Sequence, residues 1–260
     1  MAKAKKEGGI FETIKTVVVA LLLAAVIRTL FVQPFWIPSG SMKPTLLIGD
    51  YLFINKMAYG YSRYSCPFAV CPISGRLFGS EPDRGDVVVF RHPVQGVDFI
   101  KRVIGLPGDT VSITGGIITV NGEEIARTDD GVFEEIKAPQ GGFQNVPRCA
   151  NDPVEDGGTC EKERFTETMD NGKSYSVLEI GAMQADNVAQ FTIPDGQYFF
   201  MGDNRDNSQD SRYPQSVGGV GLVPAEYLLG RAEVVIFSAK GSSILKFWTW
   251  RGDRFFTRVR

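Results

Sequence analysis

The segment from Ile37 to Leu46 (IPSGSMKPTL) contains residues that could supply a nucleophile. Ser39 and Ser41 flank Gly40, and a proline stands on each side of the three. Glycine permits backbone conformations closed to other residues, and prolines stiffen a loop, so such a loop can present a hydroxyl and a backbone N–H toward one point. Attack on a carbonyl needs both a nucleophile and donors for the oxyanion. A Ser/Pro-rich linker has the same composition, so the segment alone leaves both interpretations open.

A lysine in the segment Asp98–Gly105 (DFIKRVIG) could serve as a general base. Alternate residues of a strand share a face, which places Lys101 beside Phe99 and Val103. Desolvation among apolar neighbours disfavours the charged amine, and the lysine pKa can then fall toward ~7–8, where a neutral amine accepts protons. The alternative is a strand lysine whose amine reaches water.

A third segment, Gly202–Arg212 (GDNRDNSQDSR), is dense in hydrogen-bonding groups and follows an apolar strand. It is not an EF-hand loop, because Arg205 stands where the second oxygen ligand belongs. A solvated turn is one interpretation. The mixed charges, with Asp210 close to Arg212, favour an internally paired network instead.

Other chemistries find little support. The chain has a single histidine, His92, which we interpret as a surface or hairpin residue, so no His-rich metal site can form. We expect neither a metal nor a cofactor. Ser243 and Lys246 match S-x-x-K, but the S-D-N and K-T-G motifs of penicillin-binding enzymes are missing, so this match is interpreted as chance.

The four cysteines form two local groups without C-x-x-C spacing or a nearby histidine. Two local disulfides that staple loops, in an oxidising compartment, are the simplest of the three pairings that four cysteines allow. The disulfide candidates are Cys66, Cys71, Cys149 and Cys160.

An apolar segment near the N-terminus predicts a membrane anchor. Thr16–Trp36 contains one charge, Arg28, and no small-x-small cleavage site follows its apolar centre. Residues 16–33 have about the length that crosses ~30 Å of hydrocarbon, so we expect a single uncleaved anchor. The Lys-rich head, residues 1–15, stays in the cytoplasm by the positive-inside bias, and the body lies outside. A removed signal peptide and a buried soluble helix are the alternatives.

The remaining chain is predicted to be mainly β. At 260 residues it allows one or two domains, and a formal charge of −2 gives no support to nucleic-acid binding. Short segments rich in Val, Ile, Phe and Tyr alternate with turn signals. We expect a catalytic β core from residues 34–110 and 195–260, with residues 111–194 as an inserted, loop-rich β subdomain. The predicted strands are Tyr51–Asn55, Asp86–Phe90, Asp98–Gly105, Thr110–Thr114, Gly116–Asn121, Gln197–Gly202 and Arg231–Ser238, with one late short helix at Pro224–Leu228.

The C-terminal tail, residues 247–260, mixes aromatic residues with arginines. This composition suits a surface that touches anionic lipid headgroups. Ordinary packing of a terminal strand explains it equally well.

Five motifs occur in a specific order after the apolar segment: PSGSMKPTL, GDY, RGDVVVF, DFIKRVIGLPGD and GDNRDNSQDSR. In this order and spacing they resemble bacterial type I signal peptidases (leader peptidases), which are membrane-bound serine endopeptidases with a Ser/Lys dyad on a mostly antiparallel β fold. The resemblance covers nearly half the chain. It departs from many family members in having one membrane span where they have two, and the Cys66–Cys71 segment has no counterpart that we can map.

The resemblance implies a role for each matching residue. Ser41 resembles the nucleophile and Lys101 the general base, while Ser39 resembles the oxyanion-hole hydroxyl that acts with the N–H of Ser41. Ser208 resembles the serine that orients the lysine, and Gly202 the glycine that lets the chain approach the lysine closely. Asp210 and Arg212 resemble a supporting pair. The implied shallow apolar substrate pockets, which accept small side chains, are formed by Phe35, Ile37, Pro38, Leu46, Phe99 and Ile100.

The resemblance also implies partners and a location. They are the signal peptides of exported preproteins, cut after a small-x-small motif, and the phospholipids of the bacterial inner membrane, with secretion machinery as a further partner. Three rival functions stay open: a Ser/Lys peptidase with a dedicated substrate, an anchored β domain that only binds exported chains, and an acyltransferase acting through Ser243.

Overall fold

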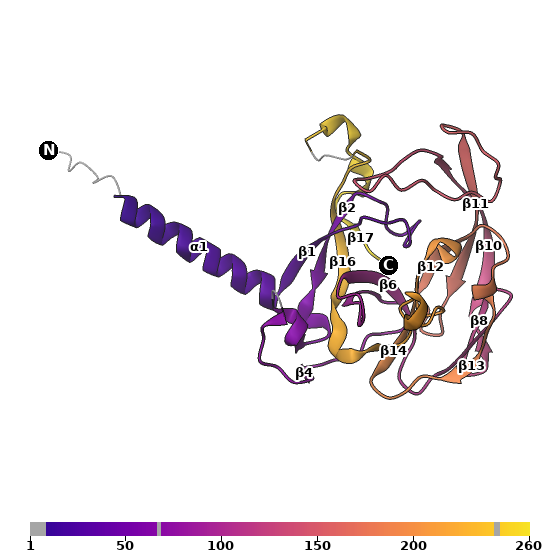
Figure 1. The fold of residues 1–260 in the computed structure, drawn as a ribbon, viewed down its shortest axis with the longest axis horizontal. Coiled ribbons are helices and arrows are strands. Elements are labelled where there is room, and N and C mark those ends of the chain that lie inside the picture. Colours follow the sequence, from indigo (N-terminus) through magenta and orange to yellow (C-terminus); the bar gives the residue numbers. More distant parts are fainter. Residues whose placement is uncertain (1–8, 67–68, 242–244) are drawn as a thin grey trace.

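The computed structural model describes residues 9–66, 69–241 and 245–260. Its N-terminal helix α1 (Ile10–Leu30) has no buried residue, and Figure 1 shows it projecting away from the β body. With a mean hydropathy of 2.3, α1 is long and apolar enough to cross a membrane. The helix starts at Ile10, before the expected span of 16–33, and ends at Leu30, because the chain turns at Phe31 and enters a strand at Val32. Gln33, which precedes Pro34, therefore has the extended backbone that proline favours in the residue before it.

One large antiparallel sheet organises the body. Its strand order is β1-β2-β16-β5-β6-β14-β15, and β17 pairs with β16. Strands that are far apart in the sequence therefore become neighbours, and the mainly antiparallel β architecture that the sequence predicted is confirmed. The bounds are β1 Val32–Trp36, β2 Asp50–Asn55, β5 Val87–Arg91, β6 Asp98–Gly105, β14 Gln197–Met201, β15 Val223–Pro224, β16 Leu228–Ser238 and β17 Thr257–Arg258.

Strand β6 is covered on both faces. Lys101 pairs in register with Val88 of β5, and Arg102 pairs with Val87 on one side and Met201 on the other. Both charged side chains are buried, with 3% of Lys101 and 1% of Arg102 exposed. The predicted apolar surroundings of the lysine are therefore present, and its neighbour is enclosed as well.

Residues 128–187 contain more strand than their polar composition predicts. Strands β10, β11 and β12 form a separate three-stranded antiparallel sheet. Many of their side chains alternate between buried and exposed positions, and a sheet with one wet face needs apolar residues at only half its positions. The bounds are β10 Ala126–Ile136, β11 Thr159–Thr168 and β12 Ser174–Glu179.

Two further small sheets complete the described strands. One has the order β13-β7-β8-β9 and the other pairs β3 with β4. Figure 1 shows α1 leaving the body on the side of β1, while β10 and β11 lie on the far side. The bounds are β3 Tyr61–Ser62, β4 Arg76–Leu77, β7 Thr110–Thr114, β8 Ile117–Val120, β9 Glu123–Glu124 and β13 Val188–Thr192.

Two local predictions need correction. His92 lies in the β5–β6 hairpin, as one of its two interpretations had it, but it is not a surface residue. It is fully buried, its Nε2 lies 3.1 Å from the carbonyl oxygen of Gly219, and its Nδ1 accepts from two backbone N–H groups. The expected late helix is a single 3-10 turn, Ala225–Tyr227, and it is not alone. Other late segments also form 3-10 turns, at Arg205–Asn207, Gln215–Val217, Phe247–Thr249 and Gly252–Arg254.

The cysteines and the C-terminal tail are tied to the body. Disulfides join Cys66 to Cys71 and Cys149 to Cys160. Arg254 and Arg251 of the tail both form ion pairs with the buried carboxylate of Asp50. The tail therefore packs against the body, and its end pairs with β16 as the short strand β17. Several of its aromatic side chains stay exposed: Phe247, Trp248 and Phe256.

Candidate active site

The loop that connects β1 to β2, residues 37–49, carries Ser41 and is called the Ser41 loop below. Its apolar side chains Ile37, Met42 and Leu46 are each at most 1% exposed and belong to one core cluster with Ile100 of β6. The loop therefore follows the sheet closely. This packing brings a flexible sequence to a defined position above β6.

Ser41 and Lys101 meet inside the body. The Nζ atom of Lys101 donates to Oγ of Ser41 at 2.6 Å and to the carbonyl oxygen of Ile100 at 3.1 Å. Ser41 is 8% exposed and Lys101 3%. A hydroxyl and an amine at this distance can exchange a proton directly, which is the geometry that a serine nucleophile and its base require.

Burial sets the charge state of the lysine. Desolvation lowers the pKa of Lys101 to about 8. The carboxylates of Asp210 and Asp203 oppose this shift, and the nearby Arg212 adds to it. A substantial fraction of the amine is therefore neutral slightly above neutral pH and can accept the serine proton.

Ser39 lies beside the nucleophile, with its Oγ 3.4 Å from Oγ of Ser41. Its side chain is exposed. A hydroxyl at this position can turn toward a substrate oxygen that enters next to Ser41.

The crowding around Gly202 comes from the Ser41 loop and Ser208. A Cβ atom at residue 202 would lie 2.3 Å from Oγ of Ser208 and 2.5 Å from the carbonyl oxygen of Ser41. The close contacts around an added Cβ are therefore made by the two serines. Only glycine fits at this position.

Ser208 is buried beside this contact, and within the described part of the chain its Oγ has no hydrogen-bond partner. The hydrogen bond to Lys101 that an orienting serine would make is not formed in this structure. A buried hydroxyl without a partner costs free energy, so its presence calls for a reason other than stability.

Asp210 and Arg212 hold the segment that follows β14. The Asp210 carboxylate accepts from Nε of Arg212 at 2.9 Å and from the N–H of Gly202 at 3.0 Å. Arg212 also donates to the carbonyl oxygen of Arg205. The paired network predicted for this segment is therefore present, and it fixes the backbone that faces Ser41.

Asn204 is a site residue that sequence reasoning missed. Its backbone N–H donates to the carbonyl oxygen of Ser41 at 3.0 Å, and its Nδ2 donates to that of Gly40 at 2.8 Å. The neighbouring Asp203 accepts two hydrogen bonds from the Arg102 guanidinium, at 2.7 and 2.8 Å. The density of hydrogen-bonding groups in this segment was the available signal, but it did not reveal the partners.

A second group of residues that sequence reasoning missed links the Ser41 loop to the three-stranded sheet of β10, β11 and β12. Lys43 donates to Glu135 of β10 and, at 2.8 Å, to Gln140. Glu135 also accepts from Lys162 of β11 at 2.9 Å, and Asn145 donates to the carbonyl oxygen of Pro38. Nothing in the local sequence indicates these contacts, because Lys43 and Glu135 are 92 residues apart.

The six residues expected to form substrate pockets divide into two sets. Ile37 and Leu46 of the Ser41 loop and Ile100 of β6 are buried in one core cluster. The others keep some exposed surface near the loop or on β6, and they are Phe35, Pro38 and Phe99.

Two other expectations concern metals and the rival serine. Within the described ranges, no group of three His, Cys, Asp or Glu side chains is arranged to hold a metal ion. Ser243, the serine of the alternative S-x-x-K match, lies outside the described residues.

Comparison with known proteins places this site in a family. The family model described as "Signal peptidase, peptidase S26" matches residues 10–237, which places the chain among serine peptidases. The chain belongs to the signal peptidase family, peptidase S26, as the five motifs indicated.

The relatives cover most of the chain. A signal peptidase I of Rickettsia typhi is 40% identical over 230 residues, which are 85% of this chain and 77% of the relative. A signal peptidase I of Rickettsia conorii is 38% identical over 247 residues, 91% of this chain and 81% of the relative. A solved signal peptidase I from Enterococcus faecalis V583 covers 58% of this chain and 97% of its own, with 23% identity and a TM-score of 0.31.

Proposed function

We propose that this chain is a membrane-anchored endopeptidase that removes signal peptides from exported preproteins, with Ser41 as nucleophile and Lys101 as general base. The observation that carries the proposal is the 2.6 Å hydrogen bond between Nζ of Lys101 and Oγ of Ser41 in a buried setting. Membership in the signal peptidase family supports the reaction class.

The first step is proton transfer from Ser41 Oγ to neutral Lys101, as Oγ attacks the carbonyl carbon before the scissile bond. The developing oxyanion accepts hydrogen bonds from the Ser41 N–H and the Ser39 hydroxyl, and each such donor contributes about 3 kcal/mol to the transition state. The lysine then gives its proton to the leaving amine. In the second half, Lys101 takes a proton from water, which hydrolyses the acyl-enzyme.

Three further residues act through these groups. The Ser208 hydroxyl orients the lysine amine once substrate displaces the resting hydrogen bond. Asp210 and Arg212 keep the segment after β14 in place, and their proximity adjusts the charge on Lys101.

The substrate binds as an extended chain against a strand edge, where alternate side chains enter pockets. The exposed parts of Phe35, Pro38 and Phe99 bound these pockets, above the core residues Ile37, Leu46 and Ile100. Shallow pockets of this kind admit small side chains, which matches cleavage after a small-x-small motif.

The location follows from α1. The basic head stays in the cytoplasm of a bacterium, α1 crosses the inner membrane, and the β body lies on the outer face. Because the Ser41 loop begins seven residues after Leu30, the active site lies close to the membrane, where the end of a signal peptide emerges.

The test is incubation of the full chain in detergent with a secreted preprotein, followed by mass measurement of the products. We expect one cut after a small-x-small motif, an adduct of a serine-reactive acylating probe on Ser41, and loss of both in Ser41→Ala. Ser174→Ala, an exposed serine on β12, is the matched control and should retain full activity. An adduct on Ser243 would support an acyltransferase, and no adduct would support a binding protein.

A further inference from the structure

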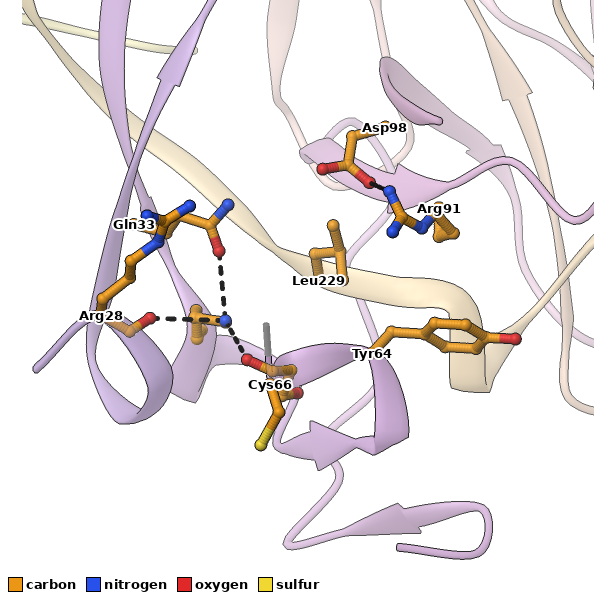
Figure 2. Close-up of a pocket in the computed structure, with 9 residues that line it drawn as sticks. Arg28, Gln33, Tyr64, Cys66, Arg91, Asp98 and Leu229 are labelled. Carbon is orange, nitrogen blue, oxygen red and sulfur yellow. Dashed lines mark hydrogen bonds and ion pairs between the residues drawn. The ribbon is translucent and has the colours of Figure 1, made fainter. Parts of the chain in front are cut away.

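A cavity lies where α1 joins the β body. Its volume is ≈ 130 Å³, well above the ~10–15 Å³ that one water needs in the same measure, so it admits a group of the size of a phosphate. Figure 2 shows Arg28 and Gln33 on one side of it and the ion pair between Arg91 and Asp98 on the other. Lys56 also contributes to the lining.

The positive charge of this cavity is only partly balanced. Arg91 donates to Asp98 at 2.7 Å, so these two charges compensate each other. Arg28 and Lys56 form no ion pair with any described residue; Lys56 donates only to neutral oxygens, those of Gln33, Ser65 and the Arg28 backbone. Two cations beside one open cavity therefore lack a counter-ion.

Lys56 is the unusual member of this pair, because it is 2% exposed. Buried lysines are rare without an anionic partner. Burial and the nearby charge of Arg28 lower the pKa of Lys56 to about 8, although Asp98 opposes the shift. An anion in the cavity would remove this unfavourable arrangement by lying next to both cations.

The level of the cavity relative to the membrane indicates which anion it binds. The helix α1 has 21 residues, and at 1.5 Å per residue it spans about 31 Å, which is close to the ~30 Å of a bilayer's hydrocarbon core. Arg28 lies in the last turn of α1. It therefore falls at the level where hydrocarbon ends and headgroup phosphates begin.

We propose that this cavity binds the phosphate of a phospholipid headgroup, with Arg28 as its exposed ligand and Lys56 as its buried counter-charge. An arginine guanidinium can hold a phosphate through two parallel hydrogen bonds. The strand β1 begins four residues after Arg28 and leads directly into the Ser41 loop. A bound headgroup would therefore set the height of Ser41 above the bilayer.

The experiment measures lipid retained by the full chain in a neutral detergent, using native mass spectrometry with added phosphatidylglycerol. We expect the wild type to retain one phosphatidylglycerol and not to retain diacylglycerol, which lacks the phosphate. Arg28→Gln should weaken retention about fivefold or more, since one cation near a headgroup contributes that much.

The matched control is Arg63→Gln. Arg63 is an exposed cation near the same junction that does not line this cavity, so its removal should leave retention unchanged. Because Lys56 is buried, thermal unfolding first shows whether the Lys56→Gln variant is folded. The folded variant should also retain less lipid than the wild type. Inorganic phosphate is the second ligand: if it displaces the lipid from the wild type but not from Arg28→Gln, a free anion can occupy the same site.

Equal retention by wild type and Arg28→Gln would overturn the proposal, as would equal losses in Arg28→Gln and Arg63→Gln or equal binding of diacylglycerol. The measurement does not depend on peptidase activity. Its outcome is therefore separate from that of the proposed function.

Discussion

At the scale of single residues, the pKa of Lys101 sets a pH dependence. The amine must be neutral to accept the proton of Ser41, and burial lowers its pKa to about 8. We therefore expect kcat/KM for a soluble peptide to fall about tenfold for each pH unit below 8 and to level off above 9. A profile that is flat between pH 6 and pH 9 would contradict the assignment. Lys101→Arg keeps the charge but cannot deprotonate, so it should be inactive throughout.

Ser208 allows a catalytic role to be separated from a structural one. Its buried hydroxyl lacks a hydrogen-bond partner within the described part of the chain. Removing an unsatisfied group costs little, so Ser208→Ala should leave the free energy of unfolding within ~0.5 kcal/mol of wild type, or raise it. If Ser208 orients Lys101 during the reaction, kcat should nevertheless fall, and the apparent pKa of the pH profile should shift. Unchanged kcat and pKa would remove Ser208 from the mechanism.

At the scale of elements, the Ser41 loop depends on the three-stranded sheet. Glu135 of β10 is the carboxylate shared by Lys43 of the loop and Lys162 of β11. Burial alone would raise the pKa of Glu135, but the two lysines hold it below its usual range. The negative charge of Glu135 therefore links the Ser41 loop to the sheet of β10 and β11.

We expect Glu135→Gln to destabilise the chain by about 3–5 kcal/mol, because two buried ammonium groups would lose their anion. Denaturant unfolding of the full chain in detergent measures this. The control is Glu134→Gln, an exposed neighbour on the same strand, which should change stability by less than ~0.5 kcal/mol. Similar values for both variants would show that the sheet does not hold the Ser41 loop through this carboxylate.

At the scale of the whole molecule, α1 contributes position and little packing: its last turn contacts the body through the carbonyl oxygens of Arg28 and Leu30, which accept from Lys56 and Tyr61. It has no buried residue, so a chain that begins at residue 25 keeps its core. Confinement of enzyme and substrate to one membrane raises their effective concentration. We expect this shortened chain to retain activity on a short soluble peptide and to lose about 100-fold on a preprotein inserted in vesicles.

The control for this deletion replaces Val17–Ile27 by eleven leucines. If α1 acts only as an anchor, this chain should process the vesicle-bound preprotein like wild type. Equal losses on both substrates would instead indicate that the shortened body is damaged.

Several features could be predicted from the sequence because they depend on local patterns. The apolar run Val17–Ile27, together with its neighbours in residues 16–33, predicts a helix long enough to cross a membrane. Alternation along β6 places Lys101 among apolar side chains, because side-chain direction on a strand has a period of two. The order of the five motifs indicated the family before any geometry was known.

Other features were decided only by the tertiary structure. Ser41 and Lys101 are 60 residues apart, and Lys43 and Glu135 are 92 apart. The burial of His92, the lack of an ion pair between Lys56 and any described residue, and the bounds and pairing of β10–β12 also went unrecognised. Composition and spacing describe a residue's own segment, whereas burial and charge pairing depend on which distant strand lies next to it, and sheet order and register determine that only when the whole chain has folded.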